Sequence, residues 1–268
     1  MKTISEIKAE FEAAPAASSP ELYARYASDT RGGVQKLIEQ YRKKEAALEA
    51  EKSRIEQMKV YEHKYEHLGY LCGIDEVGRG PLAGPVVACA VILPKDCGIL
   101  YLNDSKKLSA KKREELYDVI MEQAVAVGLG MAGPARIDEI NILQATYEAM
   151  RQAVGELKVK PQLLLNDAVT IPGITIPQVP IIKGDAKSVS IAAASIVAKV
   201  TRDRMMTEYH KVMPEYGFDS NKGYGAAAHI EAIRKYGPSP IHRRTFIKNF
   251  CNCSVQDCAF TAQSVRKR

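Results

Sequence analysis

Three apolar segments of this chain are each followed within three residues by a carboxylate, and this repeated arrangement constrains the fold more than any other feature. The junctions are residues 70–74 before Asp75 and Glu76, 163–165 before Asn166 and Asp167, and 179–182 before Lys183, Gly184 and Asp185. Short apolar runs that end in polar residues or glycine are typical of buried strands. In open sheets with parallel strands, functional groups collect where strands give way to loops. The pattern therefore predicts an α/β fold in which four acidic side chains converge.

Four carboxylates in one cleft repel one another, so a site of this kind needs cations. Ligand sets made only of oxygen favour hard ions such as magnesium or manganese over zinc. Neighbouring side chains of a strand point to opposite faces, so Asp75 and Glu76 can serve one site only if the strand ends or distorts between them, as Gly78 would allow. An isolated Asp-Glu pair is usually a solvated turn, but the further acids Asp167 and Asp185 favour a metal site.

The segment from about residue 71 to residue 246 contains six motifs in order. They are Gly73-Ile74-Asp75-Glu76-Val77-Gly78-Arg79-Gly80-Pro81, Asp104-Ser105-Lys106-Lys107-Leu108, Asp167-Ala168, Lys183-Gly184-Asp185-Ala186-Lys187-Ser188, the stretch 194–203, and Lys222-Gly223-Tyr224-Gly225. Each motif alone is weak, whereas the ordered set is specific. The set resembles ribonuclease HII, the bacterial and archaeal-type enzyme that cuts RNA within RNA–DNA hybrids, including single ribonucleotides in duplex DNA.

The resemblance implies a fold and a reaction. It implies a ribonuclease H-like α/β fold with a mixed central sheet flanked by helices, and a further helical subdomain from about residue 205 to 250. It implies two divalent ions, Mn²⁺ or Mg²⁺, and hydrolysis that leaves a 3′-hydroxyl and a 5′-phosphate. The implied catalytic, metal-binding acids are Asp75, Glu76, Asp167 and Asp185. Asp203 competes for the fourth role, but it lies in a helical stretch beside two arginines, which favours an exposed ion pair.

The resemblance also implies the residues that touch the substrate. Gly78, Arg79 and Gly80 would contact the ribonucleotide, and Tyr224 would pack on the sugar at the RNA–DNA junction. A Gly-Tyr-Gly triplet by itself is usually a turn, loop lysines usually serve solubility, and a serine at a helix start is usually a cap. The expected phosphate contacts, at a loop and at the start of a buried helix, are Lys106, Lys107, Lys187, Ser188 and Ser190.

Composition and charge fit a nucleic-acid enzyme without requiring one. The chain has 268 residues, with 38 Lys and Arg against 32 Asp and Glu, and a formal charge of +6 suits a polyanionic partner. It has no apolar stretch of about 18 residues and no secretory segment at Met1. We expect a cytoplasmic monomer that acts on RNA–DNA hybrids and ribonucleotide-containing duplex DNA, and a contact with a sliding clamp stays open.

The chain divides by composition into three parts. Residues 1–69 are rich in Lys, Glu and Ala and predict a helical N-terminal extension, either an appendage of the catalytic domain or a surface for duplex or partner contacts. Residues 70–250 form the expected catalytic domain, with a strand near 125–131 and helices over 111–124 and 137–154. Residues 251–268 are an expected flexible tail; its spacing of Cys251, Cys253 and Cys258 does not suit a zinc site.

Two alternatives to this function stay open at this point. The sister family, ribonuclease HIII, shares the acids but needs runs of ribonucleotides; Arg79 and the helical N-terminal region argue against it. A non-catalytic hybrid-binding module is the second alternative, which the intact acids disfavour. We expect no catalytic role for His229 or His242, and Ser195 is interpreted as a small residue that lets its helix pack closely.

Overall fold

The computed structural model describes residues 2–14 and 19–250, and the chain falls into two compact units, Met1–Glu56 and Gln57–Arg268. The first unit is helical, as expected, and its helices are α1 (Ile4–Ala13), α2 (Ser19–Tyr26) and most of α3 (Gly32–Gln57). Val34, Leu37 and Ile38 of α3 are buried together, and Tyr41 stacks on Phe11 with 4.8 Å between ring centroids. A short apolar cluster thus holds this unit together.

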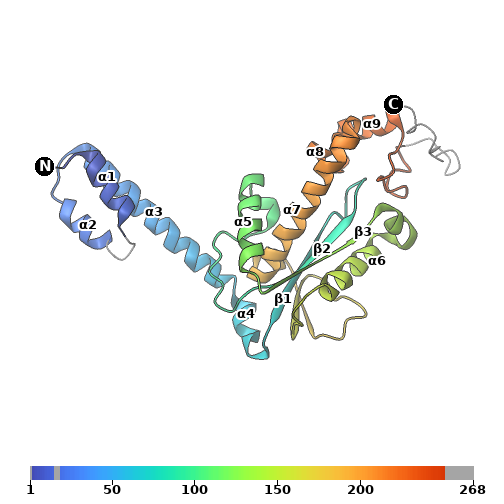
Figure 1. Ribbon diagram of the computed structural model, residues 1–268, viewed down its shortest axis with the longest axis horizontal. Coiled ribbons are helices and arrows are strands. Elements are labelled where there is room, and N and C mark those ends of the chain that lie inside the picture. The colour runs from blue at the N-terminus through green and yellow to red at the C-terminus, as the bar shows by residue number, and fades with distance from the viewer. Residues whose placement is uncertain (1, 15–18, 251–268) are drawn as a thin grey trace. The chain divides into compact units, whose positions relative to one another are not determined.

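The second unit begins before the boundary at residue 69 that composition suggested. Its described residues contain five strands, α-helices of different lengths and several short 3₁₀ helices (Figure 1). In chain order these are α4 (Val60–Tyr65), η2 (Glu66–Leu68), β1 (Leu71–Val77), β2 (Val86–Ile92), η3 (Ser105–Lys107), α5 (Ala110–Gln123), β3 (Ala126–Ala132), α6 (Pro134–Gly155), β4 (Leu163–Asp167), β5 (Gln178–Ile181), η4 (Gly184–Ala186), α7 (Val189–Val212), η5 (Pro214–Tyr216), α8 (Phe218–Asn221) and α9 (Ala227–Tyr236).

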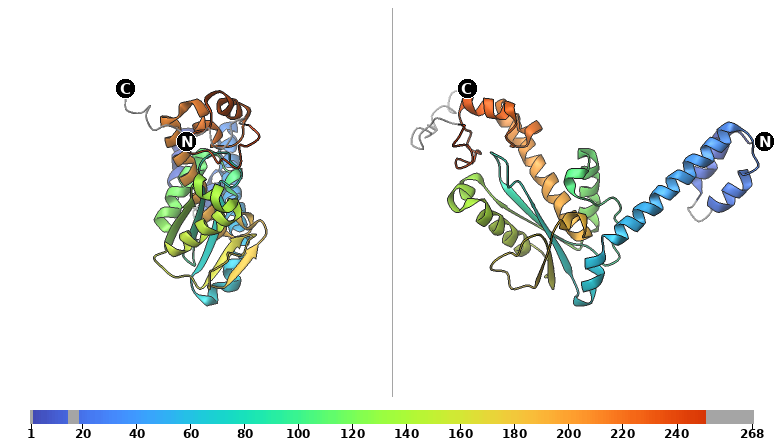
Figure 2. Two further views of the ribbon diagram at one scale, coloured as in Figure 1. Left: turned by 90° about the vertical axis from the view of Figure 1, so that its right-hand side faces the viewer. Right: turned by 180° about the vertical axis from the view of Figure 1, so that it is seen from behind.

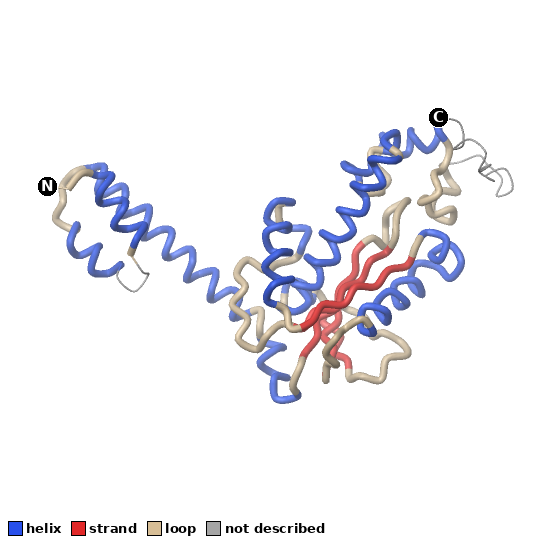
Figure 3. The backbone as a smooth tube through the Cα atoms, in the orientation of Figure 1, coloured by secondary structure: helices blue, strands red, loops and turns tan. Residues whose placement is uncertain are grey.

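The five strands form one mixed sheet in the order β3-β2-β1-β4-β5, which confirms the predicted α/β architecture (Figure 3). The pairs β3-β2 and β2-β1 are antiparallel, whereas β1-β4 and β4-β5 are parallel. Ile74 is level with Asn166, and Asp167 is level with Ile181. The carboxyl ends of β1, β4 and β5 therefore lie at the same edge of the sheet, as the three apolar junctions predicted.

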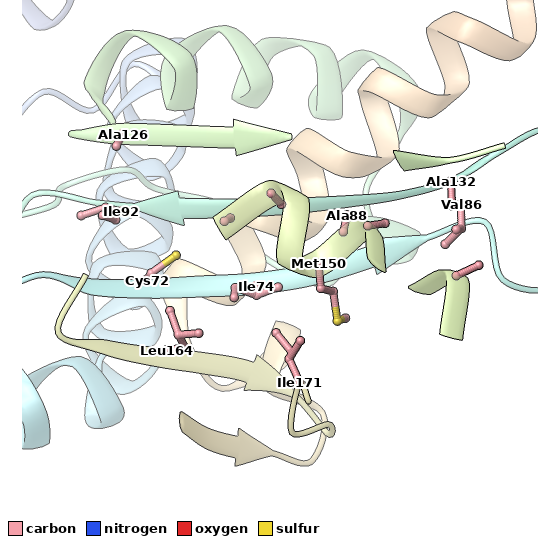
Figure 4. Close-up of a cluster of buried hydrophobic side chains, with 14 of the residues drawn as sticks. Cys72, Ile74, Val86, Ala88, Ile92, Ala126, Ala132, Met150, Leu164 and Ile171 are labelled. Carbon is pink, nitrogen blue, oxygen red and sulfur yellow. The ribbon is translucent and has the colours of Figure 1, made fainter. Parts of the chain in front are cut away.

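Helices cover both faces of this sheet (Figure 2). Helix α6 packs on one face, where Met150 meets Cys72, Ile74 and Leu164 in the main apolar core (Figure 4). Helix α7 packs on the other face, with α5 beside it. The approach of α7 is so close that a Cβ on Gly73 would stand 2.1 Å from the carbonyl carbon of Ser190. Only glycine fits there, and this contact sets the distance between α7 and the acidic end of β1.

Three local features differ from the sequence prediction. Strand β1 does not end between Asp75 and Glu76 but continues to Val77, paired with β2 along its length. The helix expected over 137–154 is interrupted at Asn141, which has a φ of 67°, and whose side chain accepts hydrogen bonds from the amides of Leu143 and Gln144. The expected C-terminal helical subdomain contains helices only as far as Tyr236.

Two further predictions from the sequence concerned the C-terminal tail and membrane-spanning segments. The cysteine-containing tail, residues 251–268, lies outside the described residues. Among the described helices none is both long and apolar enough to cross a membrane.

Candidate active site

The four predicted acids gather at the carboxyl edge of the parallel strands. Asp75 and Glu76 lie in β1, Asp167 ends β4, and Asp185 lies in η4 just after β5. The amide of Gly184 donates to Asp167 Oδ1 at 2.8 Å, which ties the turn that carries Asp185 to the end of β4. Strand pairing thus brings together residues that are up to 110 positions apart in sequence.

The electrostatics of these acids show that their charges act on one another. Burial raises the pKa of Asp75 well above its usual range, and the charges of Glu76 and Asp167 raise it further. Burial also raises the pKa of Glu76, with Arg79 opposing and Asp167 adding to the shift. The pKa of Asp185 is raised by burial and then by the charges of Asp104 and Asp167. The charge of Asp167 raises the pKa of each of the other three acids. The site therefore holds more negative charge than nearby cations neutralise.

A serine pair lies beside Asp75, and its role was missed from the sequence. The Ser195 hydroxyl of α7 lies close enough to Asp75 to oppose the rise in its pKa, and it donates a hydrogen bond to Ser105 Oγ at 2.9 Å. Ser195 was interpreted only as a small packing residue, which is incomplete because its hydroxyl is part of the site. The signal was available, since a buried hydroxyl in a helix otherwise made of alanine and isoleucine needs a partner. Asp104, whose charge raises the pKa of Asp185, is a further acid that the prediction left out.

The donor set fits a hard divalent cation, because every candidate ligand is a carboxylate oxygen and the charges repel. In the part of the chain that the structure describes, no three Asp, Glu, His or Cys side chains stand in an arrangement ready to hold an ion. The carboxylate side chains of the site would therefore have to rotate slightly to hold a cation. Glu76 Oε1, which now lies 3.3 Å from Arg79 Nη1, would exchange that partner for an ion.

The predicted substrate-contact residues lie next to the acids. Arg79 and Gly80 are exposed in the loop after β1, and a Cβ built on Gly80 would lie 3.9 Å from the Tyr224 ring. The Tyr224 side chain is 43% exposed. A loop of glycines and an accessible aromatic ring thus share one wall beside Glu76.

A histidine pair anchors the backbone of Tyr224. His229 Nδ1 lies 2.7 Å from the Tyr224 carbonyl oxygen, His229 Nε2 lies 3.0 Å from His242 Nε2, and the Ser239 amide donates to His242 Nδ1 at 2.9 Å. One proton assignment satisfies this chain: His242 Nε2 donates to His229 Nε2, and His229 Nδ1 donates to the carbonyl. Both rings are then neutral, in keeping with burial, which lowers both pKa values. The histidines position Tyr224, and their structural role agrees with the sequence expectation.

The predicted phosphate contacts divide into an exposed group and a buried group. Lys106, Lys107 and Lys187 are exposed, and the charge of Lys106 reaches both Glu76 and Asp185. The buried group is Ser188 and Ser190.

Ser188 and Ser190 are not placed to contact a phosphate. The Ser188 hydroxyl donates to Glu62 Oε1 at 2.5 Å, and the Ser190 amide donates to the same oxygen at 3.1 Å. Both serines are buried. The carboxylate of Glu62 from α4 occupies the anion position at the start of α7, so a phosphate contact by these serines stays a prediction that requires Glu62 to move.

The competitor Asp203 does not belong to the acidic group. It pairs with Lys199 at 2.7 Å and with Arg113 at 3.9 Å, and its side chain is only 16% exposed. Asp203 is thus in an ion pair, as expected, but the pair is half-buried and does not use the neighbouring arginines, because Arg202 is fully buried and Arg204 pairs with Glu114.

Comparison with known proteins decides the family. The sequence profile of the family described as Ribonuclease HII matches residues 72–252, and that of the Ribonuclease HII N-terminal domain matches residues 3–66. The chain belongs to the ribonuclease HII family. It is 64% identical over 250 residues to the Ribonuclease HII of Lachnoclostridium phytofermentans, covering 93% of this chain and 98% of that protein. The family assignment sets the sister-family alternative aside and makes the chain an endoribonuclease, a phosphodiester hydrolase.

Solved structures agree with the ribonuclease HII assignment. The crystal structure of the ribonuclease H2 from Pyrococcus horikoshii is 29% identical, with a TM-score of 0.56 over 68% of this chain and 96% of that one. The ribonuclease HII in the PCNA:RNase HII complex from Archaeoglobus fulgidus is 25% identical, with a TM-score of 0.55 over 70% of this chain and 99% of that one. The predicted ribonuclease H-like fold is confirmed.

Proposed function

We propose that this chain is a metal-dependent endonuclease that hydrolyses the RNA strand of RNA–DNA hybrids and cuts 5′ to single ribonucleotides embedded in duplex DNA. The observation that carries the proposal is the gathering of Asp75, Glu76, Asp167 and Asp185 at one sheet edge, beside the exposed Tyr224, in a chain of the ribonuclease HII family. The products would be a 3′-hydroxyl and a 5′-phosphate.

The four acids would hold two divalent ions, Mn²⁺ or Mg²⁺. When bound, such ions supply an activated water and stabilise the leaving oxygen of an in-line displacement. The protein's own contribution is placement. Strand β1 fixes Asp75, the Glu76 amide donates to the Asp75 carboxylate, and the Gly184 amide orients Asp167. These contacts restrict side-chain motion at the site before the substrate arrives.

Recognition of a ribonucleotide requires a contact with its 2′-hydroxyl, the group that distinguishes RNA from DNA at one position. The loop of Gly78, Arg79 and Gly80 is suited to this role because glycine lets main-chain groups come close to a sugar. Tyr224 beside Gly80 would pack on the neighbouring deoxyribose. A site that reads one sugar through a loop and the next through a ring can act at a single ribonucleotide.

The proposal is tested with Asp167→Asn and a matched control, Asp96→Asn, which removes an exposed carboxylate away from the site. Isothermal titration with Mn²⁺ should show binding to the unsubstituted protein and to Asp96→Asn, and weakened binding to Asp167→Asn. Cleavage of a duplex with one ribonucleotide should follow the same order. Equal Mn²⁺ binding and equal cleavage by all three proteins would remove the metal-site assignment. Binding of the duplex without cleavage by the unsubstituted protein, in either metal, would favour a non-catalytic module.

A further inference from the structure

Two arginines behind the substrate loop are fully buried and have no carboxylate partner among the described residues. Arg202 lies in α7, and Arg243 lies after α9. Burying a cation without an anion is costly, so its hydrogen-bond donors need other acceptors. Burial lowers the pKa of Arg243 to about 9, which leaves it charged at neutral pH. Both guanidinium groups donate to main-chain carbonyl oxygens, and the identity of those carbonyls indicates what the arginines do.

Arg243 holds the peptide units of the Gly78–Gly80 segment. Its Nη1 donates to the Arg79 carbonyl at 2.8 Å, its Nη2 donates to the Gly78 carbonyl, and its Nε donates to the Gly84 carbonyl at 3.1 Å. A guanidinium is a planar fork with donors in fixed directions, so it sets the orientation of each carbonyl it binds.

The orientation of these carbonyls decides where the loop's amides point. In a trans peptide unit the N–H lies opposite the C=O, and the described chain has no cis peptide bond. With the carbonyls of Gly78 and Arg79 turned inward to Arg243, the amides of Arg79 and Gly80 point outward. In the part of the chain that the structure describes, neither amide has a hydrogen-bond acceptor. Two successive free amides form the kind of concavity that binds an oxygen-rich or anionic group.

Arg202 joins the same loop to the segment that carries Tyr224. Its Nε donates to the Pro85 carbonyl at 2.9 Å, its Nη2 donates to the Ala83 carbonyl at 3.0 Å, and its Nη1 donates to the Lys222 carbonyl at 2.9 Å. The Gly223 carbonyl in turn accepts from the Leu82 amide at 2.8 Å. Arg202 therefore fixes the distance between the loop and the tyrosine.

We propose that Arg202 and Arg243 are positioning residues that hold the amides of Arg79 and Gly80 toward the ribose and phosphate of the substrate, at a fixed distance from Tyr224. This inference rests on the proposed function. The two buried charges also lie behind the donor amides, where they increase the attraction of the loop for a phosphate oxygen and are less screened by salt than surface lysines.

The test measures discrimination between ribose and deoxyribose, a quantity that a purely structural role would not change. Arg243→Lys and Arg202→Lys keep the charge but lose the planar fork. The control is Arg204→Lys, two residues along α7 from Arg202, where the guanidinium is exposed and holds no loop carbonyl. Each protein is titrated, without divalent metal, with a duplex that contains one ribonucleotide and with the same duplex made wholly of DNA.

We expect the ratio of the two affinities to fall about tenfold in Arg243→Lys and Arg202→Lys and to stay unchanged in Arg204→Lys. Far-UV circular dichroism checks the fold of each variant. A folded Arg243→Lys with the original ratio would overturn the inference. If neither buried variant folds, ¹⁵N spectra of the unsubstituted protein decide: the amide signals of Arg79 and Gly80 must shift further with the ribonucleotide duplex than with the DNA duplex, and equal shifts would overturn the inference. An unsubstituted protein that lacks both discrimination and cleavage would instead contradict the proposed function itself.

Discussion

Acid should destabilise the histidine pair that anchors Tyr224, and the structure gives the size of the effect. Burial, with a smaller effect of the neighbouring His229, lowers the pKa of His242 from 6.5 to about 3. Below pH 6.5 the unfolded chain therefore binds a proton at His242, whereas the folded chain binds this proton only near pH 3. The stability that the neutral His242 contributes is complete above pH 6.5 and is lost progressively as the pH falls toward 3. Between pH 7 and pH 5 the loss is about 2 kcal/mol.

Other groups shift stability in the opposite direction, so the measurement needs a matched variant. The raised pKa values of Asp75, Glu76 and Asp185 favour the folded state as the pH falls. His242→Gln keeps a donor and an acceptor at the position but does not titrate. Urea unfolding followed by circular dichroism at pH 7 and pH 5 should show a loss about 2 kcal/mol larger for the unsubstituted protein than for His242→Gln. An identical pH dependence of the two proteins would refute the neutral-pair assignment.

Three substitutions at the site have distinct expected outcomes. Asp75→Asn should keep hybrid binding in a gel-shift assay and lose cleavage by about a hundredfold or more, because the acids act on the reaction and not on duplex affinity; full activity would contradict the role of Asp75. Ser195→Ala should lower the unfolding free energy by about 1 kcal/mol, because Ser105 loses its partner, and should reduce turnover severalfold through the freed Asp75 carboxylate; unchanged turnover would limit Ser195 to packing. Tyr224→Ala should lower cleavage at a single ribonucleotide while Mn²⁺ affinity stays the same, and unaltered cleavage there would show that the ring does not read the junction.

The sequence predicted the sheet edge because strand signals are local. Each apolar run reports its own strand, and each carboxylate directly follows or closes that run, so Asp75, Asp167 and Asp185 could be assigned without knowing how the strands pair. The same local signals placed the helix over 111–124, which is α5. What the structure added was the order in which the strands pair within the sheet.

The contacts that the sequence did not predict all join elements distant in the chain. Ser195 lies near Asp75 because α7 packs closely over Gly73. Ser188 meets Glu62 because α4 lies against the start of α7. The same holds for the buried arginines, since nothing in their own segments shows that all but one of their carbonyl partners lie more than a hundred residues away. Each of these depends on packing, which no local pattern records.

The most direct test of the account is the position of the cut in a DNA duplex that carries one ribonucleotide. The duplex is incubated with Mn²⁺, with Mg²⁺ or with chelator, next to an RNA strand hybridised to DNA, and the product ends are mapped. The account predicts metal-dependent cutting on the 5′ side of the ribonucleotide, with a 3′-hydroxyl and a 5′-phosphate. Cutting of the long hybrid alone, or cutting that persists in chelator, would contradict it.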